Sequence, residues 1–196
     1  MREIYSRVRP GFQARPGSGA VFLDRDGVVV VDTGYLCRVE EMRLIEGAAE
    51  AIGKLNRAGI PTVMVSNQSG IGRGYYTWSE FEAVQKALEV ELDRAGAWMD
   101  GVWACASRDD EHTHRKPNPG MLLDAARDMG VDLARSWMLG DKESDVEAGL
   151  RAGVRSAIRV GVGEPSETKN VTFCRDLGVA ADLILRSASE KSCEKC

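Results

Sequence analysis

The apolar positions of this chain alternate between short unbroken runs and longer stretches with helical spacing. The short runs predict buried strands at 20–24, 61–66, 101–106, 136–141 and 154–160, with a last short strand at 182–185. The stretches with apolar residues every three or four positions predict helices at 45–55, 81–95, 119–129 and 144–152. This alternation predicts a three-layer α/β fold, with a mainly parallel central sheet and helices on both faces.

Polar motifs stand where the predicted strands end. Asp24 and Asp26 close the first apolar run, Ser66 and Asn67 close the second, and Asp141 closes the strand at 136–141. Since the carboxyl ends of parallel strands share one edge of a sheet, these side chains are expected to meet in one crevice. Open α/β folds place their active sites in that position.

The acidic residues of these motifs suit phosphoryl transfer through an aspartyl-phosphate. Asp24 is the candidate nucleophile, because a carboxylate can attack phosphorus and form a mixed anhydride that water then hydrolyses. Asp26 would protonate the leaving oxygen and later deprotonate the water. Asp141, with the Asp24 carboxylate and the Asp26 carbonyl, would hold Mg²⁺. Asp145 has two equally weighted interpretations, an outer acid of this metal site or a helix-dipole partner.

The remaining polar residues supply hydrogen-bond donors and positive charge. Ser66 and Asn67 are candidate phosphate binders through a hydroxyl and exposed backbone N–H groups. Lys116 would balance the charge of the nucleophile and of the transferring phosphoryl group. Arg115 offers a bidentate fork to substrate oxygens. Arg73, in a glycine-rich loop, would meet a second phosphate, with a solvent-facing arginine as the alternative interpretation.

Composition narrows the class of protein. With 196 residues and 43% hydrophobic content, the chain suits one domain with a full core. We expect a flexible basic arm at 1–18, a single phosphatase domain at 19–188 and a polar tail at 189–196. The 26 basic and 30 acidic residues give a net charge of −4, which does not favour nucleic acid as a partner. The sequence has no apolar run of the roughly 18 residues that a membrane helix needs, so no membrane association is expected.

Five cysteines are scattered along the chain: Cys37, Cys105, Cys174, Cys193 and Cys196. An odd and scattered set does not predict a disulfide framework, and a reducing cytoplasm fits it better. The last two have C-x-x-C spacing without a second pair, which is typical of an incidental tail. We expect a cytoplasmic monomer.

Four strings in this order, FLDRDG, VSNQSGIGRG, RKPNPGML and LGDKESD, resemble the haloacid dehalogenase (HAD) superfamily. The resemblance runs from about residue 20 to about residue 185 and implies a Rossmann-like HAD fold. It also implies that Asp24 is the nucleophile, Asp26 the acid/base, Lys116 the motif lysine and Asp141 a magnesium ligand. The segments after Asp26 and Ser66 are too short for a cap domain, so the resemblance implies a capless enzyme whose loops select the substrate.

More narrowly, the strings resemble the branch that contains heptose-1,7-bisphosphate 7-phosphatases and histidinol-phosphate phosphatases. The resemblance implies a small phosphorylated sugar as substrate and a role in heptose supply for lipopolysaccharide or capsule. The alternatives are a histidinol-phosphate phosphatase, a nucleic-acid 3′-phosphatase, which the acidic balance disfavours, and a catalytically silent HAD-like binding protein.

Members of this branch usually carry a structural zinc site in the loop before the R-K-P motif. Here that loop offers Cys105, His112 and His114 as ligands, a thiolate with two imidazoles. A fourth ligand would have to be Asp109, Asp110, Ser107 or water. The alternative is a shortened, metal-free loop whose histidines lie on the surface or touch substrate.

Overall fold

A seven-stranded sheet forms the centre of the protein in the computed structural model, which describes residues 2–161 and 168–193, with side chains to residue 188 in the last helix. The strand order is β1-β4-β3-β2-β5-β6-β7, and every neighbouring pair is parallel except the antiparallel β1–β4 pair. The strands are β1 (Ile4–Val8), β2 (Val21–Leu23), β3 (Thr62–Asn67), β4 (Gly101–Cys105), β5 (Trp137–Gly140), β6 (Ser156–Val160) and β7 (Val171–Cys174).

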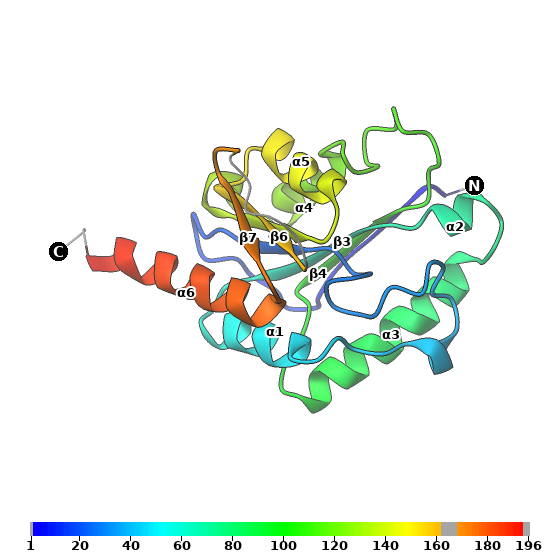
Figure 1. Cartoon of the computed structure of the whole chain (residues 1–196), viewed down its shortest axis with the longest axis horizontal. Helices are drawn as coiled ribbons and strands as arrows, with labels where there is room; N and C mark the ends of the chain where they lie inside the picture. Colours follow the sequence, from blue (N-terminus) through cyan, green and yellow to red (C-terminus); the bar gives the residue numbers. More distant parts are fainter. Residues whose placement is uncertain (1, 162–167, 194–196) are drawn as a thin grey trace.

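Helices cover both faces of this sheet and make the three layers that the sequence pattern predicts. In Figure 1, α1 (Ala48–Arg57), α3 (Trp78–Arg94) and α6 (Leu177–Cys193) lie on one face, and α4 (Gly120–Met129) and α5 (Glu143–Ala152) on the other. Successive side chains of β2 point to opposite faces of the sheet. Val21 and Leu23 therefore pack in one hydrophobic cluster and Phe22 packs in the other.

The connections after β2 and β3 are short. The first holds a single 3₁₀ turn at Val39–Glu41, and the second holds the short helix α2 (Ser69–Gly72). Neither segment builds a separate domain over the carboxyl edge of the sheet, so the predicted three-layer α/β fold without a cap domain is confirmed. In the described part of the chain, no helix is both long and apolar enough to cross a membrane.

The N-terminal segment differs from the flexible arm that we expected at 1–18. Residues 4–8 form β1, which pairs with β4 along its whole length. Tyr5 anchors this strand, because its buried ring stacks on Trp78 and meets the edge of Phe81. The sequence pattern missed the strand because an edge strand with one solvated face carries few apolar residues.

The C-terminal segment also differs from the expectation. The strand predicted at 182–185 is part of helix α6, in which Leu177, Ala180, Ala181 and Ile184 recur at helical spacing and are buried. The last strand is instead β7, a four-residue element that the apolar pattern does not single out. Helix α6 extends to Cys193, so the expected tail begins inside a helix. The C-x-x-C motif lies outside the residues whose side chains are described.

Candidate active site

A polar cleft opens at the carboxyl edge of the parallel strands. It has a volume of about 760 Å³ and is lined by residues from the ends of three strands and from the loop after β4. Asp24 follows β2, Ser66 lies near the end of β3, Lys116 lies in the loop between β4 and α4, and Asp145 lies in the first turn of α5. The predicted meeting of the motifs at one edge is therefore present in the structure.

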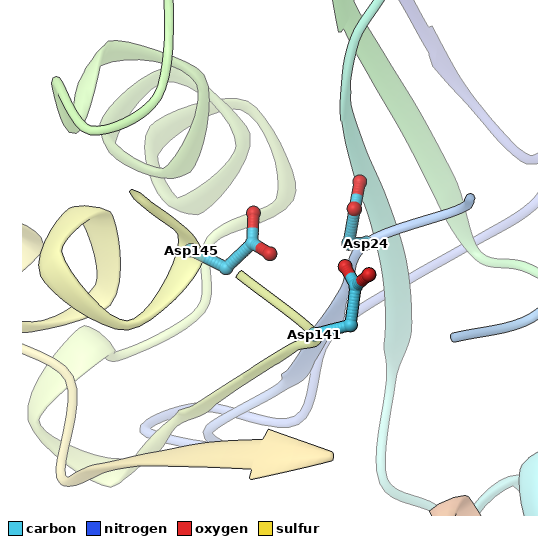
Figure 2. A group of neighbouring side chains, drawn as sticks. All are labelled: Asp24, Asp141 and Asp145. Atoms are coloured by element: carbon cyan, nitrogen blue, oxygen red, sulfur yellow. The ribbon is translucent and has the colours of Figure 1, made fainter. Parts of the chain in front are cut away.

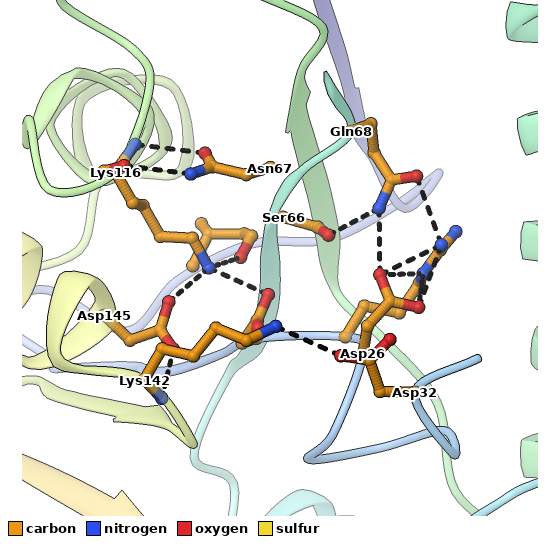
Figure 3. Close-up of polar contacts among 11 residues, drawn as sticks. Asp26, Asp32, Ser66, Asn67, Gln68, Lys116, Lys142 and Asp145 are labelled. Carbon is orange, nitrogen blue, oxygen red and sulfur yellow. Dashed lines mark hydrogen bonds and ion pairs between the residues drawn. The ribbon is translucent and has the colours of Figure 1, made fainter. Parts of the chain in front are cut away.

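Lys116 is the centre of the buried charge in this cleft. Its Nζ lies 2.8 Å from Asp24 Oδ1 and 2.6 Å from Asp145 Oδ1, and it donates a third contact, 2.8 Å long, to the carbonyl oxygen of Val65 (Figure 3). Only 3% of Lys116 and 5% of Asp24 are exposed. A single buried ammonium group thus pairs with two carboxylates at the floor of the cleft and offsets one of their two negative charges.

These surroundings shift the ionisation of both groups. Burial raises the pKa of Asp24 to about 7, because desolvation disfavours the carboxylate, while the charge of Lys116 acts in the opposite direction. The carboxylates of Asp145 and Asp24 raise the pKa of Lys116, against the desolvation that would lower it. Lys116 therefore remains a cation throughout the neutral pH range.

Asn67 fixes the segment that carries this lysine. The Asn67 side-chain amide donates to the backbone carbonyl of Lys116 at 2.9 Å and accepts from the Lys116 backbone N–H at 3.0 Å. This reciprocal pair ties the end of β3 to the loop between β4 and α4 (Figure 3). The Asn67 side chain thus positions Lys116, and the predicted phosphate contact through the backbone N–H groups at this strand end stays a prediction.

Three carboxylates gather beside Lys116 and form a candidate metal site. One oxygen each from Asp24, Asp141 and Asp145 lies within 4.8 Å of the other two (Figure 2). Asp141 Oδ1 is buried and has no hydrogen-bond partner among the described residues, and burial raises the pKa of this carboxyl. A hard divalent cation would satisfy such an oxygen, so the donor set fits Mg²⁺.

The carboxylate group contains two of the predicted Mg²⁺ ligands, Asp24 and Asp141, and adds Asp145 as a third carboxylate. The predicted ligand atom of Asp26 is its backbone carbonyl oxygen, and this part of the set stays a prediction. The side chain of Asp26 points toward Arg25 and Gln68.

Both interpretations of Asp145 match the structure: its carboxylate lies in the group of three, and its Oδ2 accepts from the backbone N–H of Lys142 at the N-terminus of α5 at 3.0 Å. Its Oδ1 pairs with Lys116.

Asp26 is held by two neighbours that we did not predict. The Arg25 guanidinium donates to both of its carboxylate oxygens, at 3.0–3.2 Å, and Gln68 Nε2 donates to Oδ2 at 3.0 Å. Gln68 also contacts the hydroxyl groups of Ser66 and Tyr76. Arg25 is only 1% exposed and lies over the ring of Phe81. An arginine between two motif aspartates reads as a surface residue in sequence, so its burial could not be foreseen.

The two arginines predicted to meet substrate differ in position. Arg115 lines the cleft, where its Nε donates to Asp110 Oδ1 at 2.8 Å and its Nη1 to the Ser107 carbonyl at 3.2 Å. Arg73 is exposed at the end of α2 and does not line the cleft. The solvent-facing alternative for Arg73 therefore matches its position in this structure.

Two further rim residues were missed by sequence reasoning. Lys142 and Asp32 form an ion pair of 3.1 Å that joins the loop after β5 to the loop after β2 (Figure 3). Tyr35 lines the same cleft and is 44% exposed. The sequence pattern offers little indication of these residues, because no characteristic spacing marks a functional lysine, aspartate or tyrosine in a loop. The one indication is that Lys142 directly follows Asp141, a residue of the candidate metal site.

The predicted zinc ligands are only partly together. Cys105 Sγ lies 3.7 Å from His112 Nδ1, whereas His114 Nε2 is 2.8 Å from Asp124 Oδ2. His112 also contacts Glu3 of the N-terminal segment at 3.3 Å. Within the described residues, these three side chains do not converge as a metal-binding group. Zinc binding in this loop stays a prediction.

A parallel sheet with a buried aspartate, a lysine and a group of three carboxylates at its carboxyl edge has the architecture of an α/β enzyme with a candidate site for a divalent cation. The haloacid dehalogenase-like hydrolase family matches residues 3–153, and the chain belongs to this family of hydrolases.

Similar proteins agree with this assignment. A D-glycero-beta-D-manno-heptose-1,7-bisphosphate 7-phosphatase of Mesorhizobium japonicum is 46% identical over 157 residues, covering 76% of this chain and 70% of that protein. A protein of the same name from Photorhabdus laumondii is 35% identical and covers 89% of this chain and 93% of that protein.

Solved structures show the same fold. A HAD-like phosphatase from Mesorhizobium loti has a TM-score of 0.85 and 39% identity, with 93% of this chain and 92% of that chain covered. The D,D-heptose 1,7-bisphosphate phosphatase of B. bronchiseptica, complexed with magnesium and phosphate, has a TM-score of 0.80 and 30% identity. That match covers 86% of this chain and 99% of the other.

Proposed function

We propose that this hydrolase is a Mg²⁺-dependent phosphomonoesterase that removes the 7-phosphate of D-glycero-D-manno-heptose 1,7-bisphosphate. The observation that carries the proposal is the buried contact of Lys116 with Asp24, next to a three-carboxylate group that fits Mg²⁺. The names of the similar proteins supply the substrate. The product would feed the synthesis of bacterial lipopolysaccharide or capsule.

In the proposed reaction, Asp24 attacks phosphorus in line with the departing sugar oxygen and becomes an aspartyl-phosphate. Lys116 holds the nucleophile and offsets the negative charge that collects around the phosphoryl group. When bound, Mg²⁺ supplies charge neutralisation between the carboxylates and the phosphate dianion. The carboxylates of Asp24, Asp141 and Asp145, together with the backbone carbonyl of Asp26, would hold it.

Asp26 and Ser66 complete the proposed machinery. Asp26 lines the cleft two residues after the nucleophile, where it donates a proton to the leaving oxygen and then accepts one from the attacking water. Ser66 also lines the cleft, and its hydroxyl donates to a phosphate oxygen. Asn67 contributes through the position of Lys116.

Two cations at the rim support a bisphosphate as substrate. Arg115 and Lys142 line the cleft on separate loops, outside the buried Lys116. A sugar that places one phosphate against Asp24 carries its second phosphate toward solvent, where a guanidinium fork and an ammonium group can meet it. The cleft is open and polar, which suits a hydroxylated sugar better than an apolar ligand.

The test is phosphate release from heptose 1,7-bisphosphate, as each anomer, and from histidinol phosphate, with Mg²⁺ and with EDTA. Metal-dependent release from the heptose, with phosphorus NMR showing that the 1-phosphate remains, supports the proposal. Preference for histidinol phosphate would keep the chemistry and replace the substrate. Absence of turnover on every phosphomonoester would favour the catalytically silent alternative.

The proposal also includes a cytoplasmic monomer and a structural zinc ion. The free thiols of Cys37, Cys105 and Cys174 fit a reducing compartment. The Cys105–His112 contact supports half of a zinc site, and His114 would have to leave Asp124 to complete it. Metal analysis of the purified protein tests zinc, and gel filtration with light scattering tests the monomer.

A further inference from the structure

Gln68 links the residues of the cleft in a way that the proposed reaction does not yet use. It follows β3 directly and is only 2% exposed. Its side chain makes four hydrogen bonds, two from Nε2 and two to Oε1, with the partners Asp26, Ser66, Arg25 and Tyr76. A primary amide has two N–H donors and two oxygen lone pairs, so every hydrogen-bonding position of Gln68 is occupied.

The chemistry of the partners allows only one orientation of this amide. Arg25 can only donate, and its Nη2 faces Gln68 Oε1 at 3.1 Å. The carboxylate of Asp26, in its ionised form, can only accept, and its Oδ2 faces Gln68 Nε2 at 3.0 Å. An exchange of the amide oxygen and nitrogen would place two donors against each other and two acceptors against each other. Arg25 and Asp26 thus fix the amide between them.

The fixed amide sets the direction of two hydroxyl groups. Tyr76 OH lies 2.6 Å from Gln68 Oε1 and must donate to it, and burial raises the pKa of this phenol, which keeps its proton in place. Ser66 Oγ lies 2.7 Å from Gln68 Nε2 and must accept from it. The Ser66 proton is then left free to point elsewhere, and Ser66 lines the cleft.

We propose that Gln68 is a positioning residue that holds the Asp26 carboxylate for proton transfer and turns the Ser66 hydroxyl into a donor for the phosphate. Arg25 and Tyr76 fix Gln68 from the interior side. The inference rests on the proposed function, because it assigns Gln68 an action through Asp26 and Ser66. A network with only a structural role would instead affect every substrate of the enzyme equally.

The leaving-group dependence of the reaction separates these two roles. Phenyl phosphate and p-nitrophenyl phosphate are close in size, but nitrophenolate is a much weaker base and leaves with little help from a proton donor. Loss of a general acid therefore slows the hydrolysis of phenyl phosphate more than that of p-nitrophenyl phosphate. It raises the ratio of kcat/KM for p-nitrophenyl phosphate to kcat/KM for phenyl phosphate. The experiment measures this ratio for the full chain with Mg²⁺, together with inhibition by inorganic phosphate.

We expect Asp26→Asn to raise the ratio about 100-fold and Gln68→Met to raise it about tenfold. Tyr76→Phe, which removes one hydrogen bond and little volume, is expected to raise it about threefold, since the amide is then less firmly held. Gln68→Met should also weaken inhibition by inorganic phosphate, because Ser66 loses its fixed direction. In the Asp26→Asn background, Gln68→Met should leave the ratio unchanged.

Gln85→Met is the matched control. Gln85 is also a glutamine with 2% exposure, but it lies on α3, is bonded to Glu89 and does not line the cleft. This variant should keep the wild-type ratio. If Asp26→Asn raises the ratio while Gln68→Met and Tyr76→Phe leave it unchanged, the inference is overturned and the proposed function stands. If Asp26→Asn itself leaves the ratio unchanged, the acid role in the proposed function fails, and the inference fails with it.

Discussion

Lys116 Nζ lies 2.8 Å from Asp24 Oδ1, although 92 positions separate the two residues in the chain. The same ammonium group also pairs with Asp145 Oδ1 at 2.6 Å. All three groups are buried at the floor of the cleft, so this one cation is the counter-charge of both a candidate nucleophile and a candidate metal ligand. The pair therefore places the main buried positive charge of the cleft beside the candidate nucleophile.

Removal of the Lys116 charge should strongly destabilise the metal-free protein. Lys116→Met leaves two buried carboxylates without a counter-charge, and breaking a buried ion pair from one side costs about 3–5 kcal/mol. Urea unfolding in EDTA measures this loss. Lys142→Met is the control, because its pair with Asp32 is exposed and such pairs contribute about 0–1 kcal/mol. Equal losses in the two variants would contradict the central role of Lys116.

The Asp24 carboxyl should make the metal-free protein more stable in mild acid than in mild alkali. Its pKa in the folded protein is about 7, because burial disfavours the carboxylate, while an aspartate in an unfolded chain ionises near ~3.9. Between these values the folded state keeps a proton that the unfolded chain has lost. The free energy of unfolding should therefore fall as the pH rises from about 4 to about 7.

Urea unfolding in EDTA at several pH values measures this dependence. Asp24→Asn has no proton to exchange at this position, so its unfolding free energy should vary less over the same range. A variant with the same pH dependence as the wild type would show that another group is responsible.

Mg²⁺ affinity should depend on Asp145 as well as on Asp141. Each contributes a carboxylate to the group of three, so Asp141→Asn and Asp145→Asn should each weaken Mg²⁺ binding about tenfold or more. Isothermal titration calorimetry measures the affinity. Asp128→Asn, on the surface of α4 and paired with Arg127, should bind as the wild type does. If Asp145→Asn bound Mg²⁺ with wild-type affinity, Asp145 would not be a metal ligand, and its role would be the ion pair with Lys116.

The N-terminal strand should contribute to stability through Tyr5. This ring is buried against Trp78 and Phe81, so Tyr5→Ala should lower the free energy of unfolding by about 3–5 kcal/mol, as for other large aromatic truncations. Tyr75, which is 61% exposed, supplies the matched Tyr75→Ala control with a much smaller effect. A negligible loss in Tyr5→Ala would restore the flexible arm that the sequence suggests.

The sequence could predict the central strands because their apolar runs are buried on both faces and are followed by polar residues. Residues such as Asp24, Ser66 and Asp141 were placed correctly at one edge, since parallel strands bring their carboxyl ends together. The edge strand β1 and the short strand β7 escaped prediction, because partial burial leaves no continuous apolar run.

Side-chain direction was the part of the site that spacing could not supply. Three features of the site depend on contacts between segments far apart in the chain. They are the hydrogen bonds of Asn67 to Lys116, the hydrogen bond of Gln68 to Asp26 and the burial of Arg25. Asp145 shows the same limit. Its position one helical turn after Asp141 fits a helix-terminus partner and a metal ligand alike, and the structure places its carboxylate where it meets both conditions.

The most direct test of the account is chemical detection of the phosphate on Asp24. Asp26→Asn should slow hydrolysis of the intermediate, so this variant can be mixed with p-nitrophenyl phosphate and Mg²⁺, quenched in acid and treated with borohydride. Borohydride reduces an aspartyl-phosphate to homoserine, which peptide mass spectrometry then locates. We predict homoserine at position 24, dependent on Mg²⁺ and absent when Asp24→Asn is added. Nitrophenol release by Asp26→Asn without homoserine at position 24 would contradict the account.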